Sequence, residues 1–386
     1  MLSPFFVNDK QLKLSRFPLA QVNRSLQAWD ASDEYLLNHI KDEQLISDTA
    51  RVLIFNDAFG ALATSFCAPL AVDLPDNLPS NKVNVFCIND SYVSSQGIAH
   101  NISQNQLSDD NITQLNSLDS LPTDIDVILF KIPKSKSLLI AQLIQIKNSI
   151  SQGNENKDTV FIAADRAKDI HSATLKLFEK YLGTTTTSLA VKKARLVFCQ
   201  FDQKQTHTSP FPTIWSLPND TLNRDFSISN HANVYSREKL DIGARYFIEN
   251  LPKVKPNSRV IDLGCGNGVI GLTVLANEPS ASIQFVDESH MAITSAQINV
   301  ETNLPELASQ CQFHLNDCLT DIESNSVDLI LCNPPFHQQT ATTDHIAWQM
   351  FKDSHRVLKK GGELRIIGNR QLAYHIKLKR IFGNEK

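Results

Sequence analysis

Two short segments of this 386-residue chain combine residue types that suit group-transfer chemistry. The first, residues 262–268, reads Asp-Leu-Gly-Cys-Gly-Asn-Gly; it ends an apolar run and opens a helical pattern. Its glycines let backbone amides approach a ligand closely and permit positive φ in the turn. Asp287 ends the next apolar run about 20 residues later, where a carboxylate can accept hydrogen bonds from ribose hydroxyls. Alone, this pattern fits a nucleotide-type site or a structural turn.

The second segment, residues 333–336, reads Asn-Pro-Pro-Phe and directly follows the apolar run at 327–332. The side-chain carbonyl of Asn333 and the backbone carbonyl of Pro334 can accept hydrogen bonds from a planar amino group, and proline stiffens the loop that aims them. Phe336 can stack on a base. These acceptors favour the positive charge that develops on a nitrogen attacking an electrophilic methyl group. Combined with the glycine segment, the motif indicates methyl transfer to an exocyclic amine.

For segments 262–268 and 333–336 to act together, the strands that precede them must end at the same edge of one sheet. Short runs rich in Val and Ile alternate with helical periodicity, which predicts βα units and a parallel sheet with helices on both faces. The run at 327–332 is almost wholly apolar, as expected of a strand buried on both faces. Open α/β sheets bind ligands at the carboxyl ends of their strands, so we expect 262–268 and 333–336 to face one crevice.

The chain also contains an internal repeat whose parts occur in the same order and at nearly the same spacing. The matching pairs are 51–63 with 259–271, 85–89 with 283–287, 101–105 with 299–303, and 126–133 with 328–335. The repeat predicts a duplicated α/β domain, with one copy at 1–215 and the other at 216–386. The polar, proline-containing region at 203–220 is the expected connection.

Composition narrows the class of protein. Hydrophobic residues make up 42% and charged residues 20%, the balance of an ordinary globular protein. No run approaches the roughly 18 apolar residues of a membrane span, and the N-terminus lacks the pattern of a secretory signal. Seven scattered cysteines without a Cys-x-x-Cys pair argue against a disulfide framework and a structural zinc site. We therefore predict a cytoplasmic protein with no metal and no membrane association.

The net charge of −4 does not by itself suggest a nucleic-acid binder. However, residues 352–386 hold ten basic and three acidic residues. Because phosphate-binding surfaces are local, this tail predicts either an RNA contact or a solvated helix face.

These motifs together resemble the class I S-adenosylmethionine-dependent methyltransferases, in particular the Asn-Pro-Pro-Phe branch that methylates exocyclic amines. Asn-Val-Tyr-Ser-Arg at 233–237 and Leu-Asp-Ile-Gly at 240–243 are similar to the ribosomal RNA guanine-N2 methyltransferases. That family has two fused, Rossmann-like methyltransferase domains, the N-terminal one degenerate. Segments 26–31, 56–60 and 192–195 resemble the large-subunit (23S) branch, and the resemblance covers nearly the whole chain.

The resemblance implies a site for S-adenosylmethionine and a pocket for the target base, with the segment from 233 to 243 covering the cofactor. The implied cofactor-binding residues are Gly264, Gly266 and Gly268 in the loop, Asp287 at the ribose, Asp317 near the adenine amine and Asp262 at the methionine end. The implied target-base residues are Asn333, Pro334, Pro335 and Phe336.

The first half departs from this pattern at the aligned positions. Asn56 stands for Gly264, Ala58 for Gly266, Ile54 for Asp262 and Lys131 for Asn333. We therefore expect that half neither to bind the methyl donor nor to catalyse. Its basic residues are expected to contact phosphates or to serve the fold; they are Lys131, Lys134, Lys136, Lys192, Lys193 and Arg195. The second half shows no counterpart of the apolar run at 196–199, which predicts an unpaired sheet edge.

The activity implied is in-line transfer of a methyl group to N2 of a guanosine in 23S ribosomal RNA, on protein-free or partly assembled RNA and without an obligate protein partner. The target base must be unpaired or extruded to enter the pocket. Methylation of 16S RNA, of adenine N6 or of a protein glutamine are alternatives, as is a non-catalytic RNA-binding assembly factor. A nicotinamide enzyme would have no use for the Asn-Pro-Pro-Phe loop.

Overall fold

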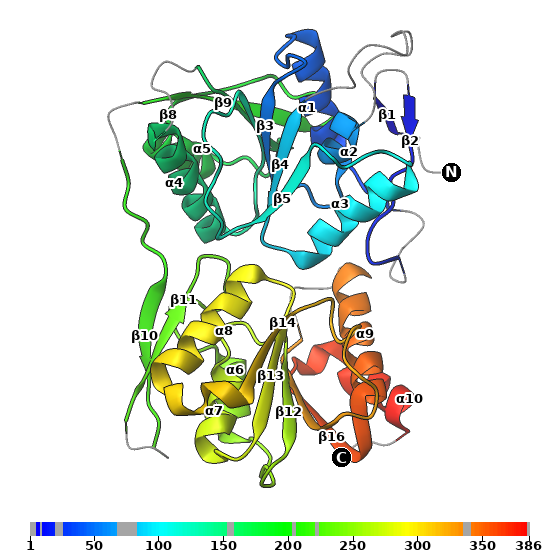
Figure 1. Cartoon of the computed structure of the whole chain (residues 1–386), viewed down its shortest axis with the longest axis vertical. Helices are drawn as coiled ribbons and strands as arrows, with labels where there is room; N and C mark the ends of the chain where they lie inside the picture. The colour runs from blue at the N-terminus through cyan, green and yellow to red at the C-terminus, as the bar shows by residue number, and fades with distance from the viewer. Residues whose placement is uncertain are drawn as a thin grey trace. The chain divides into compact units, whose positions relative to one another are not determined.

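The computed structural model describes residues 5–7, 10–19, 26–67, 83–152, 158–202, 206–220, 224–334 and 341–383. The chain divides into two compact units, Met1–Pro210 and Phe211–Lys386 (Figure 1). The predicted boundary after residue 215 falls inside strand β10 (Thr213–Leu217), which pairs with β11 (Phe226–Asn230) and so lies wholly in the second unit. Among the described residues, no helix combines the length and the apolar character needed to cross a membrane.

The first unit is built on a seven-stranded sheet in the order β5-β4-β3-β6-β7-β9-β8. The first five of these strands are parallel, and β9 is antiparallel to both of its neighbours. The strands are β3 (Arg51–Phe55), β4 (Asn84–Asn89), β5 (Ile112–Asn116), β6 (Val127–Lys131), β7 (Val160–Arg166), β8 (Gly183–Thr187) and β9 (Ala194–Phe201). A short hairpin, β1 (Phe5–Val7) and β2 (Lys10–Leu12), precedes them.

Alternate side chains of the central strands supply two cores, one on each face of the sheet. Val52 and Ile54 of β3 pack with helices α1, α2 and α3, whereas Leu53 and Phe55 pack with α4 and α5. This is the burial expected of parallel strands covered on both faces. The helices are α1 (Ala31–Asp42), α2 (Ala61–Cys67), α3 (Tyr92–Gln104), α4 (Lys136–Gln152) and α5 (Ser172–Tyr181).

The second unit carries a five-stranded parallel sheet in the order β14-β13-β12-β15-β16. Helices α6, α7 and α8 contribute to one core and α9 and α10 to the other. The strands are β12 (Arg259–Leu263), β13 (Ser282–Asp287), β14 (Cys311–Leu315), β15 (Val327–Cys332) and β16 (Leu358–Ile366). The helices are α6 (Ile242–Glu249), α7 (Val269–Asn277), α8 (His290–Asn303), α9 (Ala341–Val357) and α10 (Tyr374–Phe382), with 3-10 turns η2 (Pro305–Gln310) and η3 (Arg370–Leu372).

The two sheets share topology and register. In chain order, the five strands of the second sheet are arranged as the first five of the first sheet. Val52 pairs with Val127 in the first unit, and the aligned Val260 pairs with Leu329 in the second. The structure thus confirms the predicted α/β class with two Rossmann-like halves. The first sheet continues beyond β7 with β9 and β8, whereas no described strand pairs with the outer edge of β16.

Candidate cofactor and target-amine site

The carboxyl ends of β12, β13 and β15 bring the predicted site residues to one edge of the second sheet. The backbone amide of Gly264 donates to the carbonyl of Val286 at 2.8 Å, so the glycine loop lies against the end of β13. A Cβ placed on Gly264 would lie 3.6 Å from the carbonyl oxygen of Asn333. The glycine loop therefore lies between the two neighbouring strand ends, as predicted. Pro335 and Phe336 lie outside the described residues.

The loop needs glycine for two different reasons. Gly266 has φ +54°, and a Cβ there would meet no atom within 4 Å, so the backbone faces open space that a ligand can enter. Gly268 has φ +76°, and a Cβ there would lie 2.9 Å from the side chain of Ala296 on α8. Gly266 thus supplies a surface for a ligand, whereas Gly268 lets α7 and α8 pack closely.

The Asp287 carboxylate is held in place at the end of β13. One oxygen accepts from the backbone N–H of Gly266 at 2.9 Å, and the other accepts from the N–H of Ser289 at 3.0 Å. The side chain is half-buried. Each carboxylate oxygen can accept more than one hydrogen bond, so Asp287 keeps capacity for hydroxyl donors in the crevice.

Asp262 lies one step deeper, on β12, and is 3% exposed. One carboxylate oxygen accepts from the backbone N–H of Gly271 at 2.8 Å, in the first turn of α7. Burial raises the pKa of this carboxyl to about 7, and the nearby charge of Asp287 acts in the same direction. The hydrogen bond from Gly271 opposes that rise. A cation at the open end of the loop would restore the ionised form.

Asp317 follows β14 and is held by helix α9. Its carboxylate accepts from the side-chain amide of Gln349 at 3.1 Å, and burial raises its pKa. The Arg356 guanidinium donates to the carbonyls of Leu319 at 2.5 Å and Ile322 at 2.6 Å, which fixes the loop that carries Asp317.

Sequence reasoning did not identify Gln349 or Arg356 as site residues. The signal is their spacing: they lie seven positions apart on α9 and so share one face of the helix. Arg356 belongs to the basic tail, and here its charge satisfies loop carbonyls. Two other basic residues of the tail form ion pairs, Lys359 with Asp328 at 2.8 Å and Arg365 with Glu363 at 2.5 Å.

Asn333, the residue directly after β15, has a side-chain acceptor without a partner among the described residues. Its side-chain oxygen is buried and accepts no hydrogen bond from any described residue. Native proteins rarely leave a buried carbonyl unpaired, since the lost solvation costs about 1–3 kcal/mol. An orphaned acceptor beside an open glycine loop is the arrangement that a ligand amine would complete.

The first unit fills the corresponding crevice with its own side chains. Asn56, with φ +60°, donates from its amide to the carbonyl of Lys131 at 2.8 Å. It also exchanges two 2.9 Å hydrogen bonds with Gln142. The Lys131 ammonium pairs with Asp30 at 3.1 Å and Asp33 at 2.5 Å. Lys131, predicted from the sequence to contact phosphates or serve the fold, is therefore committed to internal ion pairs.

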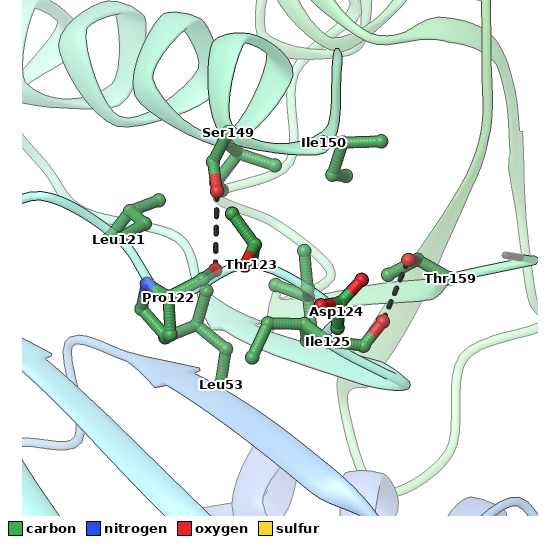
Figure 2. Close-up of a pocket in the computed structure, with 11 residues that line it drawn as sticks. Leu53, Leu121, Pro122, Thr123, Asp124, Ile125, Ser149, Ile150 and Thr159 are labelled. Atoms are coloured by element: carbon green, nitrogen blue, oxygen red, sulfur yellow. Dashed lines mark hydrogen bonds between the residues drawn. The ribbon is translucent and has the colours of Figure 1, made fainter. Parts of the chain in front are cut away.

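A pocket of the first unit lies at the other edge of its sheet (Figure 2). Its wall includes the loop that precedes β6, where the Ser149 hydroxyl donates to the carbonyl of Pro122 at 3.2 Å. Thr159, just before β7, donates to the carbonyl of Ile125 at 2.7 Å. Because the pocket lies at the amino ends of these strands, it is not the counterpart of the glycine-loop crevice.

Comparison with protein families matches both halves of the chain. Residues 3–203 match the RLMG N-terminal domain, and residues 225–386 match the methyltransferase small domain. The chain is 70% identical to the ribosomal RNA large subunit methyltransferase G of Colwellia psychrerythraea, over 100% of this chain and 96% of that protein. It is 48% identical to the protein of the same name from Pseudoalteromonas translucida, over 98% and 93%. The chain belongs to the ribosomal RNA large subunit methyltransferase G family.

A solved structure supports the two-domain fold independently. The T. thermophilus 16S rRNA N2 G1207 methyltransferase, solved with AdoMet and guanosine, aligns with a TM-score of 0.71 at 17% identity. The alignment covers 99% of this chain and 93% of that one. Membership of the family makes the chain a methyltransferase, and its second unit, which matches the methyltransferase small domain, has a Rossmann-like fold.

Proposed function

We propose that this chain transfers a methyl group from S-adenosylmethionine to the exocyclic N2 amine of a guanosine in 23S ribosomal RNA. The family relatives carry the name of a large-subunit methyltransferase, which favours 23S RNA. The observation that carries the choice of an amine is the buried side-chain oxygen of Asn333, which has no partner among the described residues. An N–H donor in the crevice would satisfy it.

The residues of the crevice fit S-adenosylmethionine, whose sulfonium supplies an electrophilic methyl group when bound. The open space at Gly266 admits a ligand against the loop backbone. In this proposal Asp287 accepts from the ribose hydroxyls, Asp317 lies at the adenine amine and Asp262 at the methionine end. Gly264 has no side chain at the position from which the Asn56 amide reaches the carbonyl of Lys131 in the first unit.

In the proposed reaction, the side-chain oxygen of Asn333 and the backbone oxygen of Pro334 accept hydrogen bonds from the two N–H groups of the target amine. This aims the nitrogen lone pair at the methyl carbon and stabilises the positive charge that develops on nitrogen. The new N–C bond forms as the methyl–sulfur bond breaks, and the surplus proton leaves the nitrogen to water. From the resemblance we expect Phe336, outside the described residues, to stack on the base.

The target base must leave any helix to enter this pocket, so protein-free or partly assembled RNA is the proposed substrate. We place the phosphate contacts of the first unit on exposed lysines, Lys134, Lys136 and Lys193, rather than on Lys131. Lys134 lies in the loop after β6, Lys136 begins α4 and Lys193 directly precedes β9, so all three lie at the edge where the parallel strands end. The reaction would take place in the cytoplasm and needs no obligate protein partner.

Methyl transfer from labelled S-adenosylmethionine to protein-free 23S and 16S RNA, measured in parallel, tests the proposal. Nucleoside analysis of the product should give N2-methylguanosine from 23S RNA alone. N2-methylguanosine from 16S RNA alone would reassign the substrate, and N6-methyladenosine would reassign the target amine. Cofactor and RNA binding without transfer to either RNA would favour a non-catalytic assembly factor.

A further inference from the structure

Two asparagines on one face of α8 hold strand β11. The Asn303 side chain accepts from the N–H of Ser227 at 2.8 Å and donates to the carbonyl of Ser227 at 2.9 Å. One helical turn earlier, Asn299 accepts from the N–H of Ser229 at 2.7 Å and donates to its carbonyl at 3.0 Å. Asn299 is fully buried. Each amide therefore pairs with one residue of β11 as a neighbouring strand would.

Asn299 and Asn303 differ in the third partner of their side-chain amides: the Asn303 amide donates to the carbonyl of Asn299 at 2.7 Å, within α8. The Asn299 amide instead donates to the carbonyl of Asn267 at 2.9 Å, in the middle of the glycine loop. The Asn267 side chain in turn donates to the side-chain oxygen of Asn230 at 2.8 Å, at the end of β11. The loop is thus attached to the α8–β11 framework through both the backbone and the side chain of Asn267.

The attachment of the loop through Asn267 matters because a glycine lies on each side of this residue. Gly266 and Gly268 both have positive φ, and glycine loses more conformational freedom on ordering than any other residue. Asn267 is the one residue between them and the one that carries a side chain there. Without its anchors, the backbone that faces the open space at Gly266 would sample other conformations.

We propose that Asn299 is a positioning residue that preorganises the glycine loop for S-adenosylmethionine. It acts through the Asn267 carbonyl and touches neither the reacting atoms nor the target amine. The inference rests on the proposed function, since it assigns the loop to that cofactor. Preorganisation lowers the entropy lost on binding, so its removal weakens cofactor affinity more than turnover.

The first unit contains the same framework without the cofactor residues. Asn101 accepts from the N–H of Ser15 at 2.8 Å and donates to its carbonyl at 2.8 Å. It also donates to the carbonyl of Phe59 at 2.6 Å, the position aligned with Asn267. Asn105 pairs with Lys13 in the same manner. The chain therefore supplies a matched control for the structural part of each asparagine's role.

The experiment measures S-adenosylmethionine binding by calorimetry for the full chain and for Asn299→Ala, Asn303→Ala and Asn101→Ala. We expect Asn299→Ala to raise the dissociation constant about tenfold, the scale of one buried hydrogen bond. Asn303→Ala and Asn101→Ala should change it less than about twofold, although all three lower the melting temperature, because β11 or its counterpart loses a pair of bonds. In the methyl-transfer assay, the KM for the cofactor should rise with the dissociation constant while kcat stays within about threefold.

If Asn299→Ala bound S-adenosylmethionine as tightly as the unchanged chain, or if all three variants lost the same affinity, the positioning role would be refuted. Asn299 would then serve only the fold. Should Asn299→Ala fail to fold, the near-isosteric Asn299→Leu fills the same volume without the hydrogen bonds and adds no buried charge, with the same expected rise. No binding by the unchanged chain would refute the proposed function itself, and the inference with it.

Discussion

The two units build one scaffold and differ where its strands end. In both, an aspartate at the start of an inner strand accepts from the first residue of the central strand: Asp126 from Arg51 at 2.8 Å, and Asp328 from Arg259 at 2.9 Å. Ser91 and Ser289 cap the equivalent helices α3 and α8 through their hydroxyls. The contacts that the two units share are therefore those that hold elements together.

The differences concentrate at the carboxyl edge. Gly264 and Asn56 have nearly the same backbone, with φ of +68° and +60°, because asparagine tolerates the left-handed region. In the first unit, however, the amide fills the crevice and bonds to Lys131. Asn333, at the position of Lys131, keeps an unpaired oxygen. In the first unit, side chains thus occupy the position of the cofactor crevice, while the order of the five parallel strands is the same in both units.

Both units place a buried carboxylate at the start of the helix that follows the loop, but from different positions. Asp262 comes from the strand and accepts from Gly271. Asp57 comes from the loop and accepts from Gly60 at 3.0 Å and the aligned Ala63 at 2.8 Å. Asp57 therefore accepts a backbone hydrogen bond on each carboxylate oxygen, whereas among the described residues Asp262 accepts one on a single oxygen and retains capacity for a ligand.

Replacing Asn333 by alanine is expected to have the largest effect. Asn333→Ala removes the orphaned acceptor but keeps the backbone carbonyl that faces Gly264, so methyl transfer should fall by about a hundredfold or more. Cofactor affinity, measured by calorimetry, should change less than about twofold, because in the proposed complex the lost oxygen would contact only the target amine. A large loss of cofactor affinity would show instead that Asn333 belongs to the cofactor site.

The next largest effect is expected when Gly264 is replaced by asparagine, the residue at the aligned position 56 of the first unit. In Gly264→Asn, the new side chain can keep φ near +60° and donate towards the carbonyl of Asn333, as Asn56 does towards Lys131. A filled crevice should weaken S-adenosylmethionine binding by about a hundredfold. The melting temperature should fall slightly, because a Cβ at this position would lie 3.2 Å from the end of the Met350 side chain, which must shift. Gly361→Asn is the control for the backbone change, because Gly361 also has positive φ, and a Cβ there would meet no atom within 4 Å. Unchanged affinity in Gly264→Asn would mean that the cofactor does not use this space.

The Asp262 carboxyl predicts a pH dependence. Its pKa of about 7 implies that it loses its charge as the pH falls through 7, so attraction for a cationic ligand weakens, by up to about tenfold per pH unit. Asp262→Asn should weaken binding at pH 8 and remove this slope, as titrations between pH 6 and 8 would show. Affinity that is independent of pH in the unchanged chain would leave Asp262 with its helix contact alone.

The raised pKa of Asp262 also makes stability depend on pH, but in the opposite direction: cofactor affinity should rise with pH, whereas stability should fall. Because the folded pKa is above the unfolded value of about 3.9, the folded state binds the proton more tightly. Stability therefore falls as pH rises from about 4 through 7, and Asp262→Asn should flatten this dependence in denaturant unfolding. Asp57→Asn, at a pKa of about 6, should do the same without any effect on cofactor binding.

Local sequence patterns predicted the strands, the repeat and the meeting of 262–268 with Asn333, because buried strands and glycine turns depend on neighbouring residues. They could not show that Lys131 turns inward to Asp30 and Asp33, because that choice depends on residues about 100 positions away. The Asn299 contact with Asn267 was equally hidden. The repeat aligned Asn299 with Asn101. The contacts of Asn299 become visible only in the structure, where α8 packs against both β11 and the glycine loop.

The smallest expected effect comes from emptying the first unit's crevice. Asn56→Gly keeps the left-handed turn but leaves Gln142, which is 1% exposed, without its amide partner. We expect a loss of about 1–2 kcal/mol in the free energy of unfolding of the full chain. Calorimetry should still give one S-adenosylmethionine per chain, because Ile54 supplies no carboxylate and Lys131 still stands in place of Asn333. Two cofactors per chain would show that one asparagine side chain had closed an otherwise competent site.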